Sequence, residues 1–283
     1  MAPVPSGLIP QRRLVRAFSR EGEGVHTGAV ARVTVAPAPF GTGITFRAGH
    51  QLPARIEHVT GSEGATALGL GPARVVTVEH LLGALYGAGI TDAWVTVRGP
   101  ELPILDGSAR PWADGIAAVG TETGPPAAVI AILEVVRVEE GATWAELRPC
   151  ARCEVAVEVD YDDPMLPRGA IEVALEGERF REEVAWARTF VLERDIPRLR
   201  DLGRGRGATP ENTVVWGSKG PSAPLRAADE PVRHKLLDAV GDLALLGAPL
   251  RGRMVVHRGS HALHHHLLRT LRERKEAWTL VEP

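Results

Sequence analysis

The stretch EPVRHKLLDAVGDLALLG, residues 230–247, predicts a helix whose polar face is unusual for a helix in contact with solvent. His234, Asp238 and Asp242 recur at every fourth position, so they lie in one line within about 80° of one another. Aspartate is a poor helix former because its side chain competes for backbone hydrogen bonds. A histidine and an aspartate at i and i+4 can both reach one metal ion. The other interpretation of this helix alone is a solvated face with one hydrogen-bonded pair.

A second helix, predicted within TVEHLLGALYGAG (residues 77–89), favours the metal interpretation. The residues after His80 form no polar face, so we expect this helix to be buried on all sides, with Thr77 as its cap. Glu79 and His80 then lie at the N-terminus of a buried helix. Buried glutamate is rare unless it is paired or functional, so the pair is predicted to take part in a site.

Together the two helices supply the side chains of a catalytic metal centre. Three ligands, His80, His234 and Asp238, with one open position are typical of a catalytic zinc site rather than a structural one. Water bound to such a zinc ion ionises near neutral pH. Glu79 is next to a ligand in sequence and is not itself a ligand, so we expect it to take the proton of the attacking water.

The chain divides into two halves of similar design. The Gly/Pro-rich stretch GTETGPPAA, residues 120–128, is typical of a linker, so we place one domain over residues 1–122 and another over residues 123–283. In both halves strand patterns are followed by a helix, a strand and a further helix, which indicates a possible duplication. Because strands come in runs instead of alternating with helices, the predicted fold class is α+β. Further helices are expected over residues 177–190, 193–203 and 261–278.

Composition excludes several classes of protein. The chain has 283 residues, of which 44% are hydrophobic, and its net charge is −2 with a pI of about 6.6. These values indicate a real core, and neither a nucleic-acid binder nor a polybasic membrane protein. The N-terminal segment has no apolar signal-peptide core, and no apolar run approaches the ~20 residues that span a bilayer. We therefore expect a cytoplasmic monomer, with Cys150 and Cys153 at a turn between two strands and without a catalytic role.

Several motifs, taken in order and spacing, resemble those of one known family. They are GEGVHTG, TVEHLLGALYGAGITDAWVTVRGPELPILDGSA, WARTF, VRHKLLDAVGDL and SHAL, and they extend over nearly the whole chain. The family is UDP-3-O-acyl-N-acetylglucosamine deacetylase, the zinc amidase of lipid A biosynthesis. The resemblance implies two similar α+β domains, each a β-sheet with helices, with the helices packed between the two sheets. It also implies a small-molecule UDP-sugar substrate, whose 2-acetamido group is hydrolysed to the free amine and acetate.

The resemblance further implies a role for each matching residue. His80, His234 and Asp238 match the family's zinc ligands, and Glu79 matches its general base. The other matches are His261 as the imidazolium acid, Asp242 as its orienting carboxylate, Thr189 as a hydroxyl that helps zinc to stabilise the oxyanion, and Lys235 and Phe190 as substrate contacts. His26 in GEGVHTG either lines the mouth of the active site or holds its own turn.

Three other features of the sequence have a simpler structural interpretation. Asp106 in LDGSA is expected to cap a helix or brace a loop. His264 and His265 stand where the family often has an asparagine pair, and together with His266 they are expected on the surface. Neighbouring residues on a helix point about 100° apart, so these histidines are not expected to share one ion.

The surroundings of the substrate site depart further from the family. Arg204 and Arg206 bring charge to a segment that forms an apolar passage for the acyl tail in the family. Either they breach this passage, or they point outward and only their stems line it.

Two other functions therefore stay open beside the lipid A deacetylase. One is a paralogous zinc deacetylase for another N-acetylated sugar that lacks a long acyl chain. The other is a non-catalytic zinc-binding homologue. The presence of both Glu79 and His261 argues against the non-catalytic homologue, because a binding module needs neither an acid nor a base.

Overall fold

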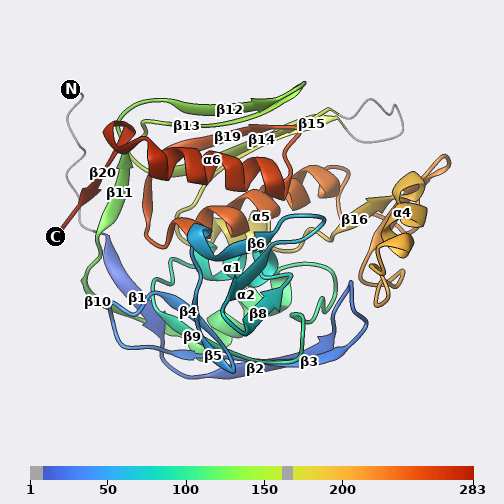
Figure 1. Ribbon diagram of the computed structural model, residues 1–283, viewed down its shortest axis with the longest axis horizontal. Helices are drawn as coiled ribbons and strands as arrows, with labels where there is room; N and C mark the ends of the chain where they lie inside the picture. The colour runs from blue at the N-terminus through green and yellow to red at the C-terminus, as the bar shows by residue number, and fades with distance from the viewer. Residues whose placement is uncertain (1–8, 161–167) are drawn as a thin grey trace.

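The computed structural model describes residues 9–160 and 168–283, and in it helices lie between two β-sheets (Figure 1). The first sheet has the strand order β2-β3-β9-β4-β5 and is formed by residues 18–98. The second sheet has the order β12-β13-β19-β11-β20, with β14 and β15 attached through β19, and is formed by residues 129–281. The predicted α+β class is therefore confirmed.

The strands of the first sheet are β2 (Phe18–Glu23), β3 (Val30–Pro37), β4 (Ile44–Ala48), β5 (His50–Pro53) and β9 (Ala93–Arg98). The strands of the second are β11 (Val129–Ile132), β12 (Val136–Glu140), β13 (Thr143–Arg148), β14 (Cys153–Val159), β15 (Gly169–Ala174), β19 (Leu250–His257) and β20 (Trp278–Val281). The helices are α1 (Glu79–Gly87), α2 (Arg110–Val119), α3 (Arg179–Glu183), α4 (Ile196–Asp201), α5 (Glu230–Leu243) and α6 (His261–Glu273).

Three smaller sheets complete the described fold. The first pairs β1 (Pro10–Leu14) with β10 (Thr121–Pro126). The second joins β6 (Val59–Gly61), β7 (Ala67–Leu70) and β8 (Ala73–Val76). The third joins β16 (Phe190–Leu192), β17 (Val214–Gly217) and β18 (Gly220–Pro221).

The two large sheets share one topology, as a duplication predicts. In the first, the central strand β9 is antiparallel to β3 and parallel to β4, and these two strands form hairpins with β2 and β5. In the second, β19 is antiparallel to β13 and parallel to β14, which form hairpins with β12 and β15. Each central strand follows a buried helix, α1 or α5, and precedes another, α2 or α6. The order strands, helix, strand, helix thus occurs in both halves.

Each sheet turns one face toward the helices because its strands alternate in polarity. In β3 and β9, for example, Val33, Val35, Val95 and Val97 are buried, whereas the residues between them are partly or fully exposed. Burying one such side chain contributes roughly 1.5–3 kcal/mol. Burial of apolar side chains between the two sheets therefore holds α1 and α5 against each other.

Two predicted helices are wrong at their ends, and the predicted linker contains a strand. The linker predicted over residues 120–128 contains β10, which pairs with β1, and the domain boundary placed after residue 122 lies within that strand. The helix predicted over residues 177–190 is confined to α3, because Phe190 begins β16 and pairs with Val214. The last helix ends at Glu273 instead of Trp278, since residues 278–281 pair with β11 as strand β20. The division into two domains itself stays a prediction.

Among the described residues, every helix is too short or too polar to cross a membrane.

Candidate active site

The site is assembled where α1 crosses α5 at very close range. Gly241 of α5 lies against the backbone of Glu79: a Cβ atom at position 241 would be 2.2 Å from the carbonyl oxygen of Glu79. Gly83 of α1 faces the backbone of Leu237 in the same way, at 3.4 Å. Glycine at these positions lets the two helix backbones touch. The start of α1 thereby comes next to the polar face of α5.

This crossing brings His80, His234 and Asp238 into one buried group. One nitrogen or oxygen of each lies within 4.8 Å of the others, and the rings of His80 and His234 are 5.2 Å apart edge to face. His234 donates from Nδ1 to the carbonyl oxygen of Ala187 at 3.1 Å, so its Nε2 is left facing Asp238 Oδ1 at 3.4 Å. That backbone bond selects the tautomer a metal ligand needs.

The charges in this group match a divalent cation. Burial, followed by the repulsion of His234, lowers the pKa of His80 to about 3, so the ring is neutral. Burial tends to raise the pKa of Asp238, but His234 and Lys235 outweigh it and hold the pKa well below its usual range. Two neutral imidazoles and one carboxylate fit zinc in ligand type and number. The same donors would leave a fourth position open.

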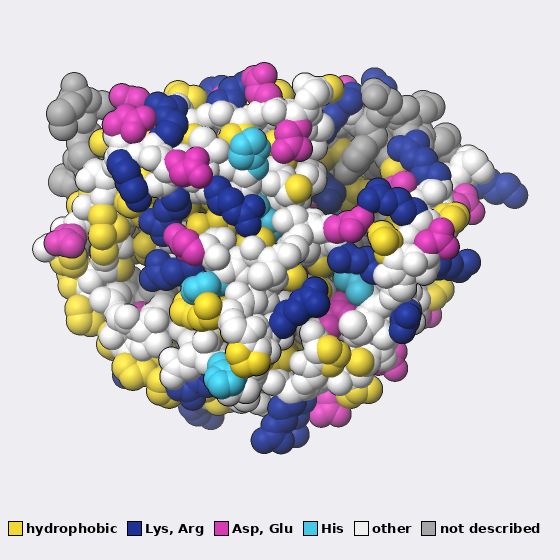
Figure 2. Space-filling view, viewed as in Figure 1, with side chains coloured by type: hydrophobic (Ala, Val, Ile, Leu, Met, Phe, Trp, Pro, Cys, Tyr) yellow, Lys and Arg dark blue, Asp and Glu magenta, His cyan; other side chains and the backbone are white. Residues whose placement is uncertain are grey.

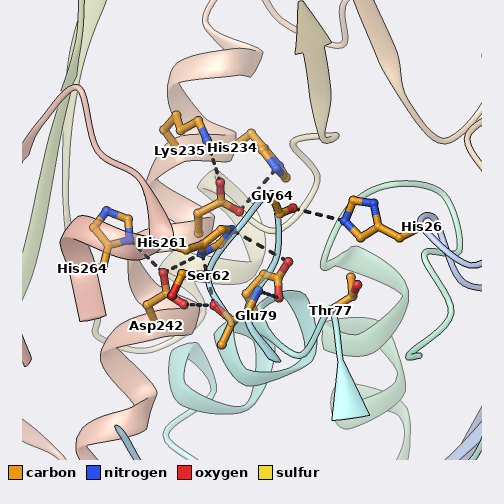
Figure 3. Close-up of polar contacts among 12 residues, drawn as sticks. His26, Ser62, Gly64, Thr77, Glu79, His234, Lys235, Asp242, His261 and His264 are labelled. Atoms are coloured by element: carbon orange, nitrogen blue, oxygen red, sulfur yellow. Dashed lines mark hydrogen bonds and ion pairs between the residues drawn. The ribbon is translucent and has the colours of Figure 1, made fainter. Parts of the chain in front are cut away.

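Glu79 and His261 face each other beside this group (Figure 3). Glu79 Oε1 lies 3.9 Å from His261 Nε2, and Glu79 Oε2 accepts the backbone N–H of Thr66 at 3.0 Å. Burial raises the pKa of Glu79 to about 7, against the attraction of His261. Burial by itself would lower the pKa of His261, but the ion pair and hydrogen bond to Asp242 prevail and raise it to about 10. A base and an acid therefore share one small space.

Asp242 is completely buried and accepts four hydrogen bonds. His261 Nδ1 lies 2.7 Å from Oδ2, and His264 Nδ1 lies 2.8 Å from the same oxygen. Thr66 Oγ1 donates to Oδ1 at 2.6 Å, and His265 Nε2 lies 3.1 Å from that oxygen. Four histidine and threonine groups thus satisfy both oxygens of one carboxylate.

The expected surface position of the histidine run is therefore wrong for two of its three members. His264 and His265 are buried against Asp242, whereas His266 is half exposed and lies 3.4 Å from Glu140. The error has a geometric cause. Positions i, i+3 and i+4 share a helix face, so His264 and His265 lie on the same face as His261. Two neighbouring rings also reach one carboxylate readily, because it offers an oxygen to each.

A cavity of about 560 Å³ opens onto these residues. Six of the ten residues proposed for the site line it directly, namely His26, Glu79, His80, Thr189, Phe190 and Lys235. The other four, His234, Asp238, Asp242 and His261, lie behind them in the contacts described above. The structure therefore brings all ten together.

The outer wall of the cavity is the segment around α4, over which basic side chains gather (Figure 2). Leu192, Ile196 and Leu199 give it an apolar surface. Arg204 also lines the cavity, and its Nη1 is buried without a hydrogen-bond partner among the described residues. Arg206 is exposed and does not line the cavity. Of the two arginines in question, one therefore faces the cavity and the other faces out.

Segment 187–190 owes its position to a buried ion pair. Arg188 donates from Nε and Nη2 to both carboxylate oxygens of Glu230, at 2.9 and 3.1 Å. Glu230 is the first residue of α5, so the pair ties this segment to the helix that carries His234. On either side of Arg188, the carbonyl of Ala187 reaches His234, and Thr189 faces the cavity.

Lys235 and Phe190 form one corner of the cavity. The ammonium group of Lys235 lies 3.1 Å from Asp238 Oδ2 and 5.6 Å from the centre of the Phe190 ring. The Phe190 ring also meets His234 edge to face, with 6.2 Å between centroids. A cation and an aromatic face are thus placed beside the His/His/Asp group.

His26 lies at the mouth of the cavity, in a turn that Glu101 organises. Glu101 accepts the backbone N–H of His26 at 3.0 Å, and the N–H and hydroxyl of Thr27, each at 2.7 Å. Burial is the main reason that the pKa of His26 is lowered. Its Nε2 lies 3.3 Å from the carbonyl of Gly64. Of the two expected roles of His26, the structure therefore supports lining the mouth, while Glu101 holds the turn.

The predicted cap of α1 is wrong. Thr77 has a φ of 61°, and its hydroxyl donates to Glu101 Oε1 at 2.7 Å instead of to the helix. The residue before α1 is Val78, which has no capping side chain. Thr77 therefore supports the mouth of the cavity.

The expected positions of Asp106 and Cys150 are confirmed. Asp106 braces its loop: it accepts the backbone N–H and hydroxyl of Ser108 at 3.1 and 2.8 Å, and pairs with Arg226 at 3.0 Å. Cys150 lies in the turn between β13 and β14, and Cys153 begins β14. Both cysteines are free thiols outside the cavity described above.

Several residues of the site have no recognisable signal in the sequence. Thr66, Ser62 and Glu101 reach it from loops and strand ends of the first half, through contacts that only the fold creates. His264 and His265 are different, because their spacing from His261 could have revealed them.

Comparison with known proteins supports one family. Residues 11–273 match the family model LpxC, described as UDP-3-O-acyl N-acetylglycosamine deacetylase. A protein of Anaeromyxobacter dehalogenans (strain 2CP-C) is 39% identical over 92% of this chain and 86% of its own length. One of Acidithiobacillus ferrooxidans (strain ATCC 53993 / BNL-5-31) is 38% identical over 97% of this chain and 94% of its own, and one of Brucella ovis (strain ATCC 25840 / 63/290 / NCTC 10512) is 37% identical over 96% and 98%. All three are named UDP-3-O-acyl-N-acetylglucosamine deacetylase.

Proposed function

This chain belongs to the UDP-3-O-acyl-N-acetylglucosamine deacetylase family, and on that premise we propose that it hydrolyses the N-acetyl group of such a UDP-sugar in lipid A biosynthesis. One observation carries the chemistry: a buried carboxylate and a buried imidazole face each other at 3.9 Å beside a His/His/Asp group that can hold a metal ion. Amide hydrolysis needs a base for the water, an acid for the nitrogen and a stabiliser for the oxyanion.

His80, His234 and Asp238 would hold the metal, and their chemistry favours zinc. A zinc ion at such a site supplies Lewis acidity to the hydrolysis. The carbonyl of Ala187 keeps His234 in the ligating tautomer, and Lys235 screens the outer oxygen of Asp238.

Glu79 acts as the base and His261 as the acid. The water oxygen attacks the amide carbon while Glu79 takes one of its protons. The C–N bond then breaks, and His261 gives its Nε2 proton to the departing nitrogen. The free amine and acetic acid result, and the acid loses its proton to become acetate. Proton exchange with water restores ionised Glu79 and protonated His261. Asp242 keeps His261 protonated beforehand through the 2.7 Å bond to Nδ1. Thr189 lines the cavity, and its hydroxyl would help to stabilise the oxyanion. Lys235, Phe190 and His26 line the same cavity and would contact the substrate.

Product analysis of purified protein with a series of UDP-sugars tests this function. We expect acetate and a free amine from UDP-3-O-acyl-N-acetylglucosamine. Turnover confined to N-acetylated sugars without an acyl chain would favour the paralogous deacetylase instead. Metal binding without turnover of any of them would favour the non-catalytic homologue.

We also propose that the protein acts as a monomer in the cytoplasm. Val30, Leu70 and Leu280, which are among the large apolar side chains exposed in the described part, belong to three different sheets. The two cysteines are unpaired, as is usual in a reducing compartment. Light scattering and cell fractionation test the two statements.

A further inference from the structure

Three histidines of α6 converge on the single carboxylate of Asp242. His261, His264 and His265 occupy positions i, i+3 and i+4, so their rings leave the helix on one face and meet α5 there. Two ring nitrogens lie at Oδ2 and one at Oδ1, with Thr66 as the second donor to Oδ1. His261 faces Glu79, whereas the other two rings bond to Asp242 behind it. His265 also contacts Thr66, whose hydroxyl lies 3.1 Å from its Nε2.

The outer ends of these two rings differ. His265 Nδ1 lies 2.7 Å from the hydroxyl of Ser62, which crosses from the first half of the chain. His264 Nε2 is buried without a hydrogen-bond partner among the described residues, packed near Gly259. Within the described part of the chain, the His264 ring has one polar contact, at Nδ1. Asp242 therefore orients this ring, and the ring in turn fixes the position of the carboxylate.

A carboxylate that accepts several hydrogen bonds holds each partner less strongly than one that accepts a single bond. Every N–H aimed at Asp242 stabilises its negative charge, so less of that charge is left to stabilise the cation of His261. His261 bonded to an otherwise free carboxylate would keep its proton tightly and would be a weak acid. Sharing the carboxylate makes the same proton easier to transfer.

We propose that His264 and His265 are positioning residues, which fix Asp242 and share its charge so that His261 can give its proton to the departing amine. This inference rests on the acid role of His261 in the proposed function. The ionisable side chains around His261 are Glu79 and His80 on α1, His234, Asp238 and Asp242 on α5, His264 and His265 on α6, and His26 in the turn before β3. In the variants below, all but one of these groups are unchanged.

The experiment replaces each ring by a side chain without a donor, in H264L and H265L, and measures kcat and KM across pH. Without one of its donors, Asp242 has more negative charge left to stabilise the His261 cation, so the pKa of His261 rises. The alkaline limb of kcat/KM, where His261 loses its proton, should therefore move up by about half a pH unit or more. At neutral pH kcat should fall several-fold with little change in KM. H264N and H265N keep an N–H donor and should restore most of the limb. H266L changes the exposed histidine beside His264 and His265. It should match the parent protein both in kcat and in the alkaline limb of kcat/KM.

Two results would overturn the inference. One is an unmoved alkaline limb in leucine variants that fold and bind metal as the parent does, because a merely structural role lowers the active fraction without moving the limb. The other comes from ¹⁵N NMR of the unmodified protein, which needs no variant to fold. We expect the proton on Nδ1 of His264 and on Nε2 of His265, where each faces Asp242. A proton only on the opposite nitrogen of either ring would leave nothing to donate.

Failure of the proposed function would look different. If H261A kept the parent's activity and its alkaline limb, the acid assignment itself would be wrong. If H261A lost both while the leucine variants kept the parental limb, only the positioning role would fail.

Discussion

At the scale of single residues, burial and neighbouring charges set the pKa values of the two reacting side chains, Glu79 and His261. Glu79 and His261 are both buried, yet both pKa values are raised, for different reasons: burial acts on Glu79, and Asp242 overcomes burial at His261. A glutamate that binds a proton near neutral pH is suited to act as a base, and a histidine held as a cation is suited to act as an acid.

Replacing Glu79 by glutamine should separate metal binding from catalysis. E79Q keeps the shape of the side chain but cannot accept a proton, so deacetylation should fall roughly 10²-fold or more, the usual scale for loss of a general base. Metal content should be unchanged because Glu79 is not among the three grouped ligands. Full activity in this variant would remove Glu79 from the mechanism.

Replacing His234 by alanine should release most of the metal. Only two of the three grouped donors remain in H234A, and they are too few for a stable zinc site. Elemental analysis of the purified protein measures this. H266A, altered at a half-exposed histidine away from the group, is the matched control and should keep its zinc. Equal zinc in both variants would show the ligand assignment to be wrong.

The rate should depend on pH as a bell. Activity requires Glu79 ionised, so it falls as the pH drops through a pKa that burial raises to about 7. It requires His261 protonated, so it falls again as the pH rises through a pKa that Asp242 raises to about 10. A bound cation repels protons and moves both limbs to lower pH. A flat kcat/KM profile between about pH 5 and pH 9, with chemistry rate-limiting, would contradict this pair of roles.

At the scale of elements, the closeness of α1 and α5 determines whether the site exists. Both helices are buried, and Gly241 allows a backbone contact with Glu79 that a Cβ atom would block. The two helices carry six of the ten proposed site residues, namely Glu79, His80, His234, Lys235, Asp238 and Asp242. A seventh, His261 of α6, is hydrogen-bonded to Asp242.

Replacing Gly241 by alanine should force these helices apart. Alanine is the better helix former by about 1 kcal/mol, but its Cβ would lie 2.2 Å from the carbonyl oxygen of Glu79, which is backbone and cannot turn aside. Overpacking of this kind typically costs about 1–3 kcal/mol of stability, and here it should also lower metal affinity.

Thermal unfolding and zinc titration of G241A measure the two effects. G83A is the matched control on the facing helix, since its Cβ would find the Phe180 ring at 3.3 Å and the Leu237 carbonyl at 3.4 Å. We expect a clearly smaller loss for G83A. Equal behaviour of the two variants would mean that the backbone contact at Gly241 is not what sets the spacing.

At the scale of the whole molecule, the segment around α4 closes the cavity from the second half and meets the first. Arg198 of α4 forms an ion pair with Glu63 of the first half at 2.5 Å. Behind this pair the apolar wall is interrupted by Arg204, whose buried Nη1 is left unbonded. An acyl chain that passes this point would have to desolvate the guanidinium further.

We therefore predict weak selection for long acyl chains. Each methylene buried in a good passage contributes about 0.8 kcal/mol, or roughly fourfold in binding, and this gain should stop where Arg204 meets the chain. The measurement is kcat/KM for substrates with acyl chains of about two to fourteen carbons, where an early plateau is expected.

Two leucine variants sharpen this prediction. R204L should extend the rise to longer chains, and R206L, altered outside the cavity, should not. In the parent protein, a steady several-fold rise of kcat/KM per methylene up to the longest acyl chain would contradict an interruption of the passage by Arg204. The arginine stem would then be part of an ordinary acyl passage.

The sequence by itself determined the elements of this protein whose pattern is local. Spacing of four residues placed His234, Asp238 and Asp242 on one helix face, and an uninterrupted apolar run marked α1 as buried. The repeated order of strands and helices indicated the duplication that the two sheets display. These features depend on residues within one or two turns or strands of each other, where the period of the backbone dictates which side chains meet.

Tertiary structure alone decided which distant residues contact these helices. Asp242 is 176 residues from Thr66 in sequence, and Ser62 is 203 residues from His265, so no periodicity relates these partners. His264 lies in the core and not in solvent because Asp242, on another helix, offers its ring a hydrogen-bond acceptor. The ends of elements also depended on distant partners. Trp278, for example, is in a strand because it pairs with β11. Local pattern determines which face of an element is polar, and only the packing of distant elements determines what that face meets.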